Sequence, residues 1–134
     1  MKKTAIITIL IASVLFGLSS CKSGSHNQDI YKLTTDNFVD ETSKGIVMVD
    51  FWATWCMPCK AMAPVIEEIA TQTKGKVKIG KVDVDANQPL ANQFGIQAIP
   101  TIIIFKDGKP MEKLVGLQSK ASLVNALSKY VDIQ

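Results

Sequence analysis

The sequence contains no arginine, one histidine and only three cysteines among its 134 residues. Its fifteen basic side chains are all lysines and nearly balance twelve acidic ones, so it lacks the clustered basic surface that nucleic-acid binding requires. Three cysteines are too few to staple a small disulfide-rich scaffold. The single histidine, His26, leaves no second Cys/His pair for a zinc site. We therefore expect no nucleic-acid partner, no metal and no cofactor.

Long apolar runs are also missing, apart from one near the start of the chain. Ala5–Leu18 carries no charge and follows two lysines, Lys2 and Lys3. A membrane-spanning helix needs about twenty apolar residues, so a shorter stretch behind a basic end is typical of a secretory signal peptide. We assign residues 1–20 to this signal, whose removal leaves thirteen lysines against the same twelve acidic residues.

The end of this signal resembles the lipobox of bacterial lipoproteins, in which an aliphatic residue and two small residues precede a cysteine. The matching residues are Leu18, Ser19, Ser20 and Cys21. The resemblance implies cleavage before Cys21 and a lipid on its sulfur, which would anchor the protein to a bacterial membrane on the periplasmic or envelope side. The alternative is an ordinary secretory signal in which Cys21 is a spare thiol. Residues 21–29 are polar and predict a flexible tether.

Residues 30–134 have the length of one domain with its own core and show no repeats. Apolar periodicity, capping residues and turn signals predict five strands and four helices. We expect strands at 30–33, 46–52, 76–84, 101–105 and 111–115. We expect four helices: one capped by Thr34–Asp36 and ending near Lys44–Gly45, and others at 57–73, at 87–94 and from 119 to about 131. This order predicts an α/β fold with a central mixed sheet of about five strands and helices on both faces, because crossovers give parallel pairs and a hairpin gives an antiparallel pair.

Two cysteines separated by two residues, Cys56 and Cys59, lie between the apolar strand at 46–52 and the next helix. A helix N-terminus presents unpaired N–H groups and a partial positive charge, which stabilise a thiolate and lower its pKa. Cys56 is therefore expected to be the exposed nucleophile and Cys59 the resolving thiol one turn deeper. The alternatives are half of a zinc site, for which a second ligand pair is missing, and a static disulfide across a loop too short to add much stability.

The stretch from 49 to 60 around these cysteines resembles the active-site stretch of thioredoxins. The second half of the family pattern is matched by Ala98–Thr101, Phe105–Gly108 and Val115–Gly116. The resemblance covers residues 30–134 and implies the thioredoxin fold, with a redox-active disulfide between Cys56 and Cys59. Met57 is the one departure, since thioredoxins most often have glycine there. We expect it to change the redox potential or the choice of partner.

The resemblance also implies a proton acceptor. Asp50 matches the aspartate that thioredoxins bury beneath the dithiol. A carboxylate in an apolar strand loses its hydration, which raises its pKa, so Asp50 is expected to take the proton of Cys59. The alternative is an Asp50 side chain turned out of the sheet. Lys81 matches a lysine near that aspartate and would tune it, although a solvated strand lysine fits the sequence equally well.

The resemblance further implies a substrate-binding surface. Pro100 matches the family's cis-proline, which lies against the dithiol and helps to keep metal away. The backbone of Ile99 would then be free to pair with an extended substrate, as in strand addition. The expected surface is completed by Trp55, Met57 and Pro58, while Trp52 fits either this surface or the core.

The resulting hypothesis is an exported, membrane-anchored thiol–disulfide oxidoreductase. It would act as a monomer, reduce or isomerise disulfides of envelope proteins, and regain electrons from a membrane donor. One alternative is an oxidase that donates its disulfide to folding exported proteins. Another is a redox-silent module that holds extended peptides beside Pro100. Redox potential separates the first two functions, and a requirement for Cys56 separates both from the third.

Overall fold

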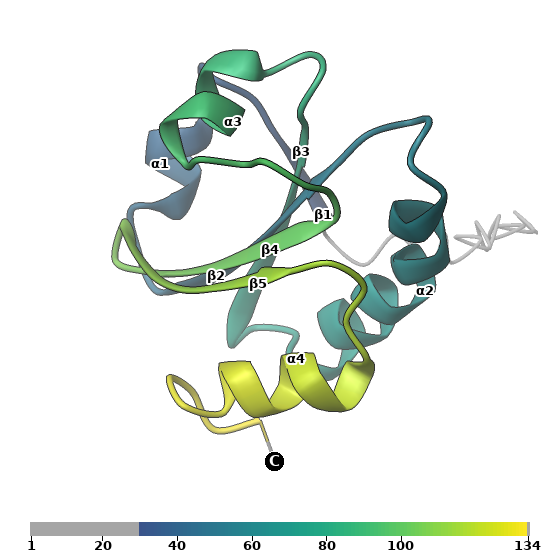
Figure 1. The fold of residues 1–134 in the computed structure, drawn as a ribbon. Helices are drawn as coiled ribbons and strands as arrows, with labels where there is room; N and C mark the ends of the chain where they lie inside the picture. Colours follow the sequence, from purple (N-terminus) through teal and green to yellow (C-terminus); the bar gives the residue numbers. More distant parts are fainter. Residues whose placement is uncertain (1–29, 134) are drawn as a thin grey trace, which may run out of the picture.

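The computed structural model describes residues 30–133. The predicted signal peptide, the predicted lipid site at Cys21 and the tether that contains His26 all lie outside the described residues. The elements follow one another in the order predicted from the sequence (Figure 1). The strands are β1 (Ile30–Leu33), β2 (Ile46–Trp52), β3 (Val77–Asp83), β4 (Thr101–Lys106) and β5 (Lys109–Val115), and the helices are α1 (Phe38–Thr42), α2 (Met57–Gln72), α3 (Gln88–Gln93) and α4 (Lys120–Leu127).

The five strands form one mixed sheet in the order β1-β3-β2-β4-β5. β3 pairs in parallel with β1 and with β2, whereas β4 runs antiparallel to both β2 and β5. The β4–β5 hairpin turns at Asp107 and Gly108, whose φ angles of 49° and 79° are those of a tight hairpin turn that favours glycine. The predicted mixed sheet of five strands is confirmed.

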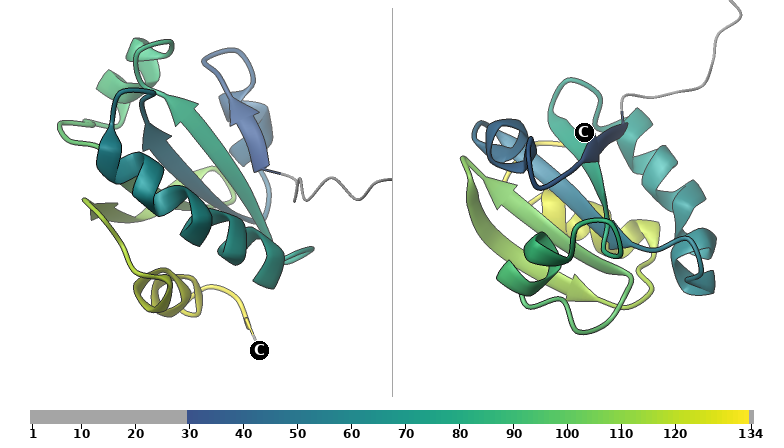
Figure 2. Two further views of the ribbon diagram at one scale, coloured as in Figure 1. Left: turned by 90° about the vertical axis from the view of Figure 1, so that its right-hand side faces the viewer. Right: turned by 90° about the horizontal axis from the view of Figure 1, so that it is seen from above.

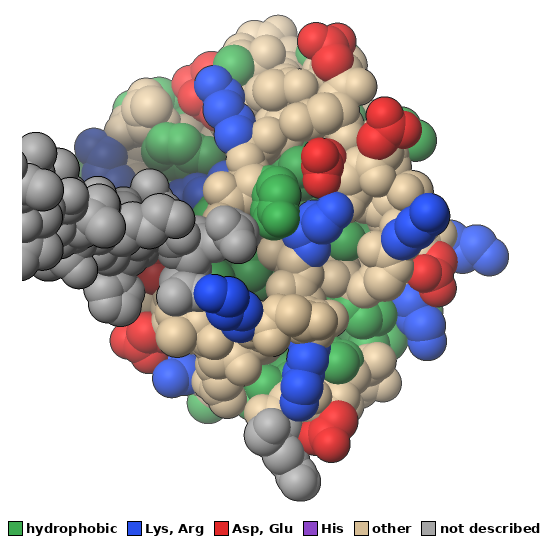
Figure 3. All heavy atoms as spheres, turned by 180° about the vertical axis from the view of Figure 1, so that it is seen from behind, with side chains coloured by type: hydrophobic (Ala, Val, Ile, Leu, Met, Phe, Trp, Pro, Cys, Tyr) green, Lys and Arg blue, Asp and Glu red, His purple; other side chains and the backbone are tan. Residues whose placement is uncertain are grey.

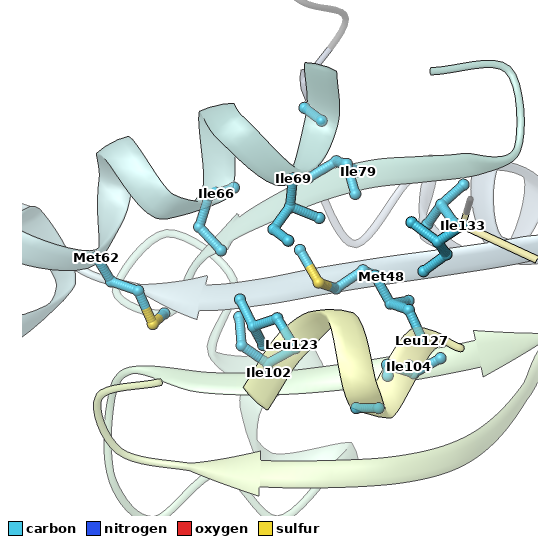
Figure 4. Packing of buried hydrophobic residues seen from close by; sticks show 13 residues of the cluster. Met48, Met62, Ile66, Ile69, Ile79, Ile102, Ile104, Leu123, Leu127 and Ile133 are labelled. Carbon is cyan, nitrogen blue, oxygen red and sulfur yellow. The ribbon is translucent and has the colours of Figure 1, made fainter. Parts of the chain in front are cut away.

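Helices cover both faces of the sheet, as Figure 2 shows in two further views. Side chains alternate along β2, so Met48 packs with residues of α2 and α4, while Val47 and Val49 pack with residues of α1 and α3. Figure 4 shows the first of these layers, where Met62, Ile66 and Ile69 of α2 face the sheet. Burial on both faces explains why β2 and β4 are continuous apolar runs rather than alternating ones.

The start of α1 differs from the prediction. Thr34–Asp36 does not cap the helix, because Asn37 holds the N-cap position and makes no side-chain cap hydrogen bond. The Asn37 side chain instead accepts a hydrogen bond from the backbone N–H of Thr34 at 2.7 Å and donates one to the carbonyl of Lys32 at 3.1 Å. It therefore stabilises the turn that leads from β1 into the helix.

The end of α4 also differs from the prediction. Its start is as expected, since Ser119 Oγ accepts a hydrogen bond from the backbone N–H of Ser122 at 3.2 Å. The helix ends at Leu127 rather than near 131. The backbone N–H groups of Tyr130 and Val131 both turn back to the carbonyl of Leu127, so the following residues form a turn. No helix within residues 30–133 is long and apolar enough to cross a membrane.

Candidate active site

Cys56 and Cys59 lie where β2 gives way to α2 and form a disulfide with Cα atoms 5.3 Å apart. Cys56 has extended backbone angles and is the N-cap residue of α2, and its Sγ accepts a hydrogen bond from the backbone N–H of Cys59 at 3.2 Å. Pro58 follows in the first turn, where the N–H that proline lacks has no helical partner. The free N–H groups and the dipole of a sixteen-residue helix therefore point at the Cys56 sulfur.

The expectation that Cys56 is exposed is wrong for the disulfide form. Cys56 is 3% exposed and Cys59 is 2% exposed, so exposure does not separate the two thiols. Both pack with Ala53 in a small apolar cluster, against which Trp52 and Ile99 also lie. What separates them is the helix terminus, because the Cys56 sulfur caps the helix whereas Cys59 lies within its first turn.

Asp50 is buried on the side of the sheet that carries Cys59. It lies two residues after Met48 on β2, so it is on the same face of the sheet and points toward α2 rather than out of the sheet. Its side chain is 0% exposed, and neither carboxylate oxygen has a hydrogen-bond partner among the described residues. Burial raises the pKa of Asp50 from 3.8 to about 6, although the nearby Lys81 ammonium lowers it in part. A carboxylate with this pKa can accept a proton near neutral pH.

Lys81 connects Asp50 to Trp52. It lies opposite Asp50 in the parallel β2–β3 register, and its Nζ is 3.7 Å from Asp50 Oδ2, which is an ion-pair distance but too long for a hydrogen bond. The same Nζ lies 4.4 Å from the centroid of the Trp52 ring, within cation–π range. Trp52 is half-buried and also packs against the cysteines. The alternative of a fully solvated strand lysine therefore does not describe Lys81.

A groove of about 450 Å³ lies beside the disulfide. The Ile99–Pro100 peptide bond is cis and Pro100 is buried. Ile99 packs against the cysteine cluster and also lines the groove. Trp55 also lines the groove and is 65% exposed. The remaining lining residues are Val84, Ala91, Ile96, Gln97 and Ala98. This groove can hold an extended segment with apolar side chains next to the disulfide.

Met57 and Pro58 do not line this groove. Both lie on the exposed first turn of α2, and Met57 is 69% exposed. The Met57 side chain therefore presents an apolar group at the surface directly beside Cys56. This exposed position is where the sequence predicts a change in partner preference.

Asp85 is a site residue that sequence reasoning missed. Its Oδ2 accepts a hydrogen bond from Trp55 Nε1 at 2.8 Å, which fixes the orientation of an otherwise exposed indole. Asp85 follows β3 in a turn whose backbone N–H groups donate to Asp83 Oδ1. The only signal in the sequence is a pair of aspartates at the end of a strand, and that pattern does not reveal a partner thirty residues away.

Comparisons with known proteins agree with this site and fold. A family model described as Thioredoxin matches residues 29–129. Thioredoxin of Staphylococcus saprophyticus is 49% identical over 102 residues, which cover 76% of this chain and 98% of the relative. Thioredoxin of Staphylococcus aureus is 47% identical over 102 residues, with the same coverage.

A solved structure is similar as well. A mutant thioredoxin from Halobacterium salinarum NRC-1 has a TM-score of 0.72 and 33% sequence identity to this chain. The match covers 80% of this chain and 95% of that chain. Together with the family model, which spans both the sheet and the dithiol, these similarities show that the chain belongs to the thioredoxin family and is a thiol–disulfide oxidoreductase.

Proposed function

We propose that this protein is an exported reductase or isomerase of protein disulfides, anchored to a bacterial membrane by a lipid on Cys21. The basic, apolar and small-residue segments of the first twenty residues support export, and Cys21 stands where a lipoprotein signal has its modified cysteine. The family model matches residues 29–129, so the proposed leader lies outside the part of the chain that the model matches. The disulfide at the helix N-terminus, with a buried carboxylate of raised pKa beneath the same helix, carries the redox part of the proposal.

The proposed reaction moves two electrons to the substrate. The Cys56 thiolate attacks one sulfur of a substrate disulfide, which forms a mixed disulfide and expels the other substrate sulfur as a thiolate. Cys59 then gives its proton to the Asp50 carboxylate and attacks the Cys56 sulfur, which releases the second substrate sulfur. The substrate ends as a dithiol and the protein ends with the Cys56–Cys59 disulfide. Isomerisation begins with the same first step. A different substrate thiol then attacks the substrate sulfur of the mixed disulfide, which forms a new substrate disulfide and releases the Cys56 thiolate.

The proposal also defines the partners. The substrates are envelope proteins that present a disulfide in an extended segment, which the groove beside Ile99 and the Met57 surface receive. The reaction consumes the dithiol at each turnover, so a donor must return two electrons. In the proposal this donor lies in the membrane. We propose that the protein acts as a monomer and binds no nucleic acid. Figure 3 shows lysine and acidic side chains interspersed over the back of the domain rather than a basic face.

Two other functions use the same features. An oxidase would run the reaction in reverse and donate the Cys56–Cys59 disulfide to folding proteins. A redox-silent module would use only the groove that Trp55 and Ile99 line. The raised pKa of Asp50 favours either redox function over the redox-silent module, because a buried group that titrates near neutral pH can take the Cys59 proton in reduction and return it in oxidation.

The direction of electron flow is tested by equilibrating the protein with glutathione redox buffers and measuring the fraction of Cys56–Cys59 disulfide. We expect a potential closer to about −270 mV than to about −120 mV, the range that thiol–disulfide proteins span. The Met57→Gly variant, which restores the family's common residue, is the matched comparison and measures what Met57 contributes. A potential above about −180 mV would contradict the reductase and favour the oxidase.

The anchor is tested by replacing Cys21 with serine in the full chain. We expect the wild-type protein in the membrane fraction with its N-terminus at Cys21 and an acyl mass on that residue, and the Cys21→Ser protein without the acyl mass. The Ser23→Ala variant, which leaves the signal and Cys21 intact, should behave as the wild type. A wild-type protein whose Cys21 carries no lipid would contradict the lipid anchor while leaving the redox function untouched.

A further inference from the structure

Lys113 makes contacts that the reaction described above does not use. Its Nζ on β5 donates hydrogen bonds to the backbone carbonyls of Phe94 at 3.0 Å and Gly95 at 2.7 Å. These carbonyls come directly after α3, whose C-cap residue is Phe94. The last carbonyls of a helix lack helical partners and carry a partial negative charge, so a lysine is well suited to bind them.

The segment that leaves this point forms one side of the groove beside the disulfide. Ile96, Gln97, Ala98 and Ile99 all line the groove, and Ile99 also packs against the cysteines. The far end of the segment is held too, because the N–H of Gly116 donates to the carbonyl of Pro100 at 2.8 Å. Lys113 and Gly116 follow one another closely along the chain, so β5 and its end hold both ends of this segment.

The other contacts of the segment show what Lys113 adds. The ring of Phe94 packs between Phe38 and Phe105, with centroids 5.1 and 5.3 Å away, so the side chain of Phe94 is held without Lys113. Gly95 has no side chain, and its φ of 57° is one that glycine adopts readily. The Lys113 hydrogen bonds therefore act where the chain turns from the aromatic core into the groove.

We propose that Lys113 is a positioning residue that fixes the groove segment for protein substrates. This inference rests on the proposed reduction of protein disulfides. A partner that adds a strand beside Ile99 needs that backbone held in one conformation, since ordering the segment at the moment of binding costs conformational entropy. A small disulfide that reaches Cys56 without entering the groove has no such requirement. Lys113 thus affects recognition of proteins and leaves the chemistry at sulfur unchanged.

The test compares Lys113→Met with the wild type in steady-state reduction of a protein disulfide, insulin, and of a small aromatic disulfide. Lys113→Met keeps an unbranched chain that ends at the Cε position of lysine but removes the Nζ donors. We expect its KM for insulin to rise roughly threefold or more, as loss of two charged hydrogen bonds permits, with an unchanged kcat and an unchanged rate on the small disulfide. Lys113→Arg should restore the KM. Lys109→Met, at an exposed position on the same strand, should match the wild type.

Amide hydrogen exchange gives a second readout. We expect faster exchange at Gly95–Ile99 in Lys113→Met and unchanged exchange in the strands. If the variant does not fold, Lys113→Gln, which keeps a donor, replaces it in all assays and should show a smaller rise in KM. An unchanged KM for insulin, or an equal loss on both substrates, overturns the inference. If the wild type reduces the small disulfide but not insulin, the proposed function fails and not the role of Lys113 alone.

Discussion

Replacing Cys56 with serine will abolish disulfide reduction, with a loss of turnover on the order of 10³-fold or more. Serine lacks the thiolate that the N-terminus of α2 stabilises at this position, so the first bond to the substrate cannot form. The measurement is reduction of insulin by the purified variant with excess dithiol as electron source. Ser23→Ala serves as the control, because Ser23 lies outside the residues that the thioredoxin family model matches.

Replacing Cys59 with serine will have a different result, because it removes only the second step. Cys56 can still attack, so the Cys59→Ser protein should accumulate as mixed disulfides with its partners, and their identification will define pathway and direction together. The double variant Cys56→Ser/Cys59→Ser controls for capture through Cys21. Capture by Cys56→Ser but not by Cys59→Ser would reverse the assigned roles. A Cys56→Ser protein that keeps its biological role would favour the redox-silent peptide-binding module.

The order of elements could be predicted from the sequence because local patterns encode it. β2 and β4 are buried on both faces and are therefore continuous apolar runs, while the hairpin between β4 and β5 needs residues that accept positive φ at Asp107 and Gly108. The dithiol could be placed for the same reason, since a Cys-x-x-Cys pair between such a strand and a helix leaves little choice of position. These features depend on residues close to one another in the chain.

The features that could not be predicted depend on residues far apart in the chain. Nothing in β2 or β4 indicates that they pair with each other in antiparallel fashion. The Trp55–Asp85 hydrogen bond and the contacts of Lys113 with the end of α3 are likewise set by the folded sheet. The burial of Cys56 follows from packing of its disulfide with Trp52 and Ile99, which no local pattern shows.

The second large effect concerns the stability of the disulfide form and comes from Asp50. Its pKa is 3.8 in the unfolded chain and about 6 when folded. Between these values the folded protein binds more protons than the unfolded one, so the free energy of unfolding falls as pH rises. A difference of about two pKa units corresponds to about 3 kcal/mol, lost between roughly pH 4 and pH 7. Below that window both states are protonated and above it both are ionised, so the loss is confined to it.

The Asp50→Asn variant cannot ionise, so it should escape this loss. We expect its free energy of unfolding, relative to the wild type, to increase by about 3 kcal/mol between roughly pH 4 and pH 7. The measurement is urea denaturation of the wild type and the variant, each with the Cys56–Cys59 disulfide formed. Subtracting the wild-type free energy of unfolding at each pH removes the contributions of the titrating groups that the two proteins share. Asp36→Asn, at an exposed position, should follow the wild type at every pH. A constant difference between Asp50→Asn and the wild type would mean that Asp50 is not a buried group with a raised pKa.

The same variant connects stability to function. Asp50→Asn has no base to take the Cys59 proton, so release of the mixed disulfide should slow by roughly 10²-fold near neutral pH and lose its inflection near pH 6. Lys81→Met removes the cation 3.7 Å from the carboxylate, which should raise the pKa of Asp50 further and move both the inflection and the stability loss to higher pH. Movement of one without the other would contradict a shared origin in Asp50. The buried charge that lowers stability near neutral pH is thus the same group that the release step requires.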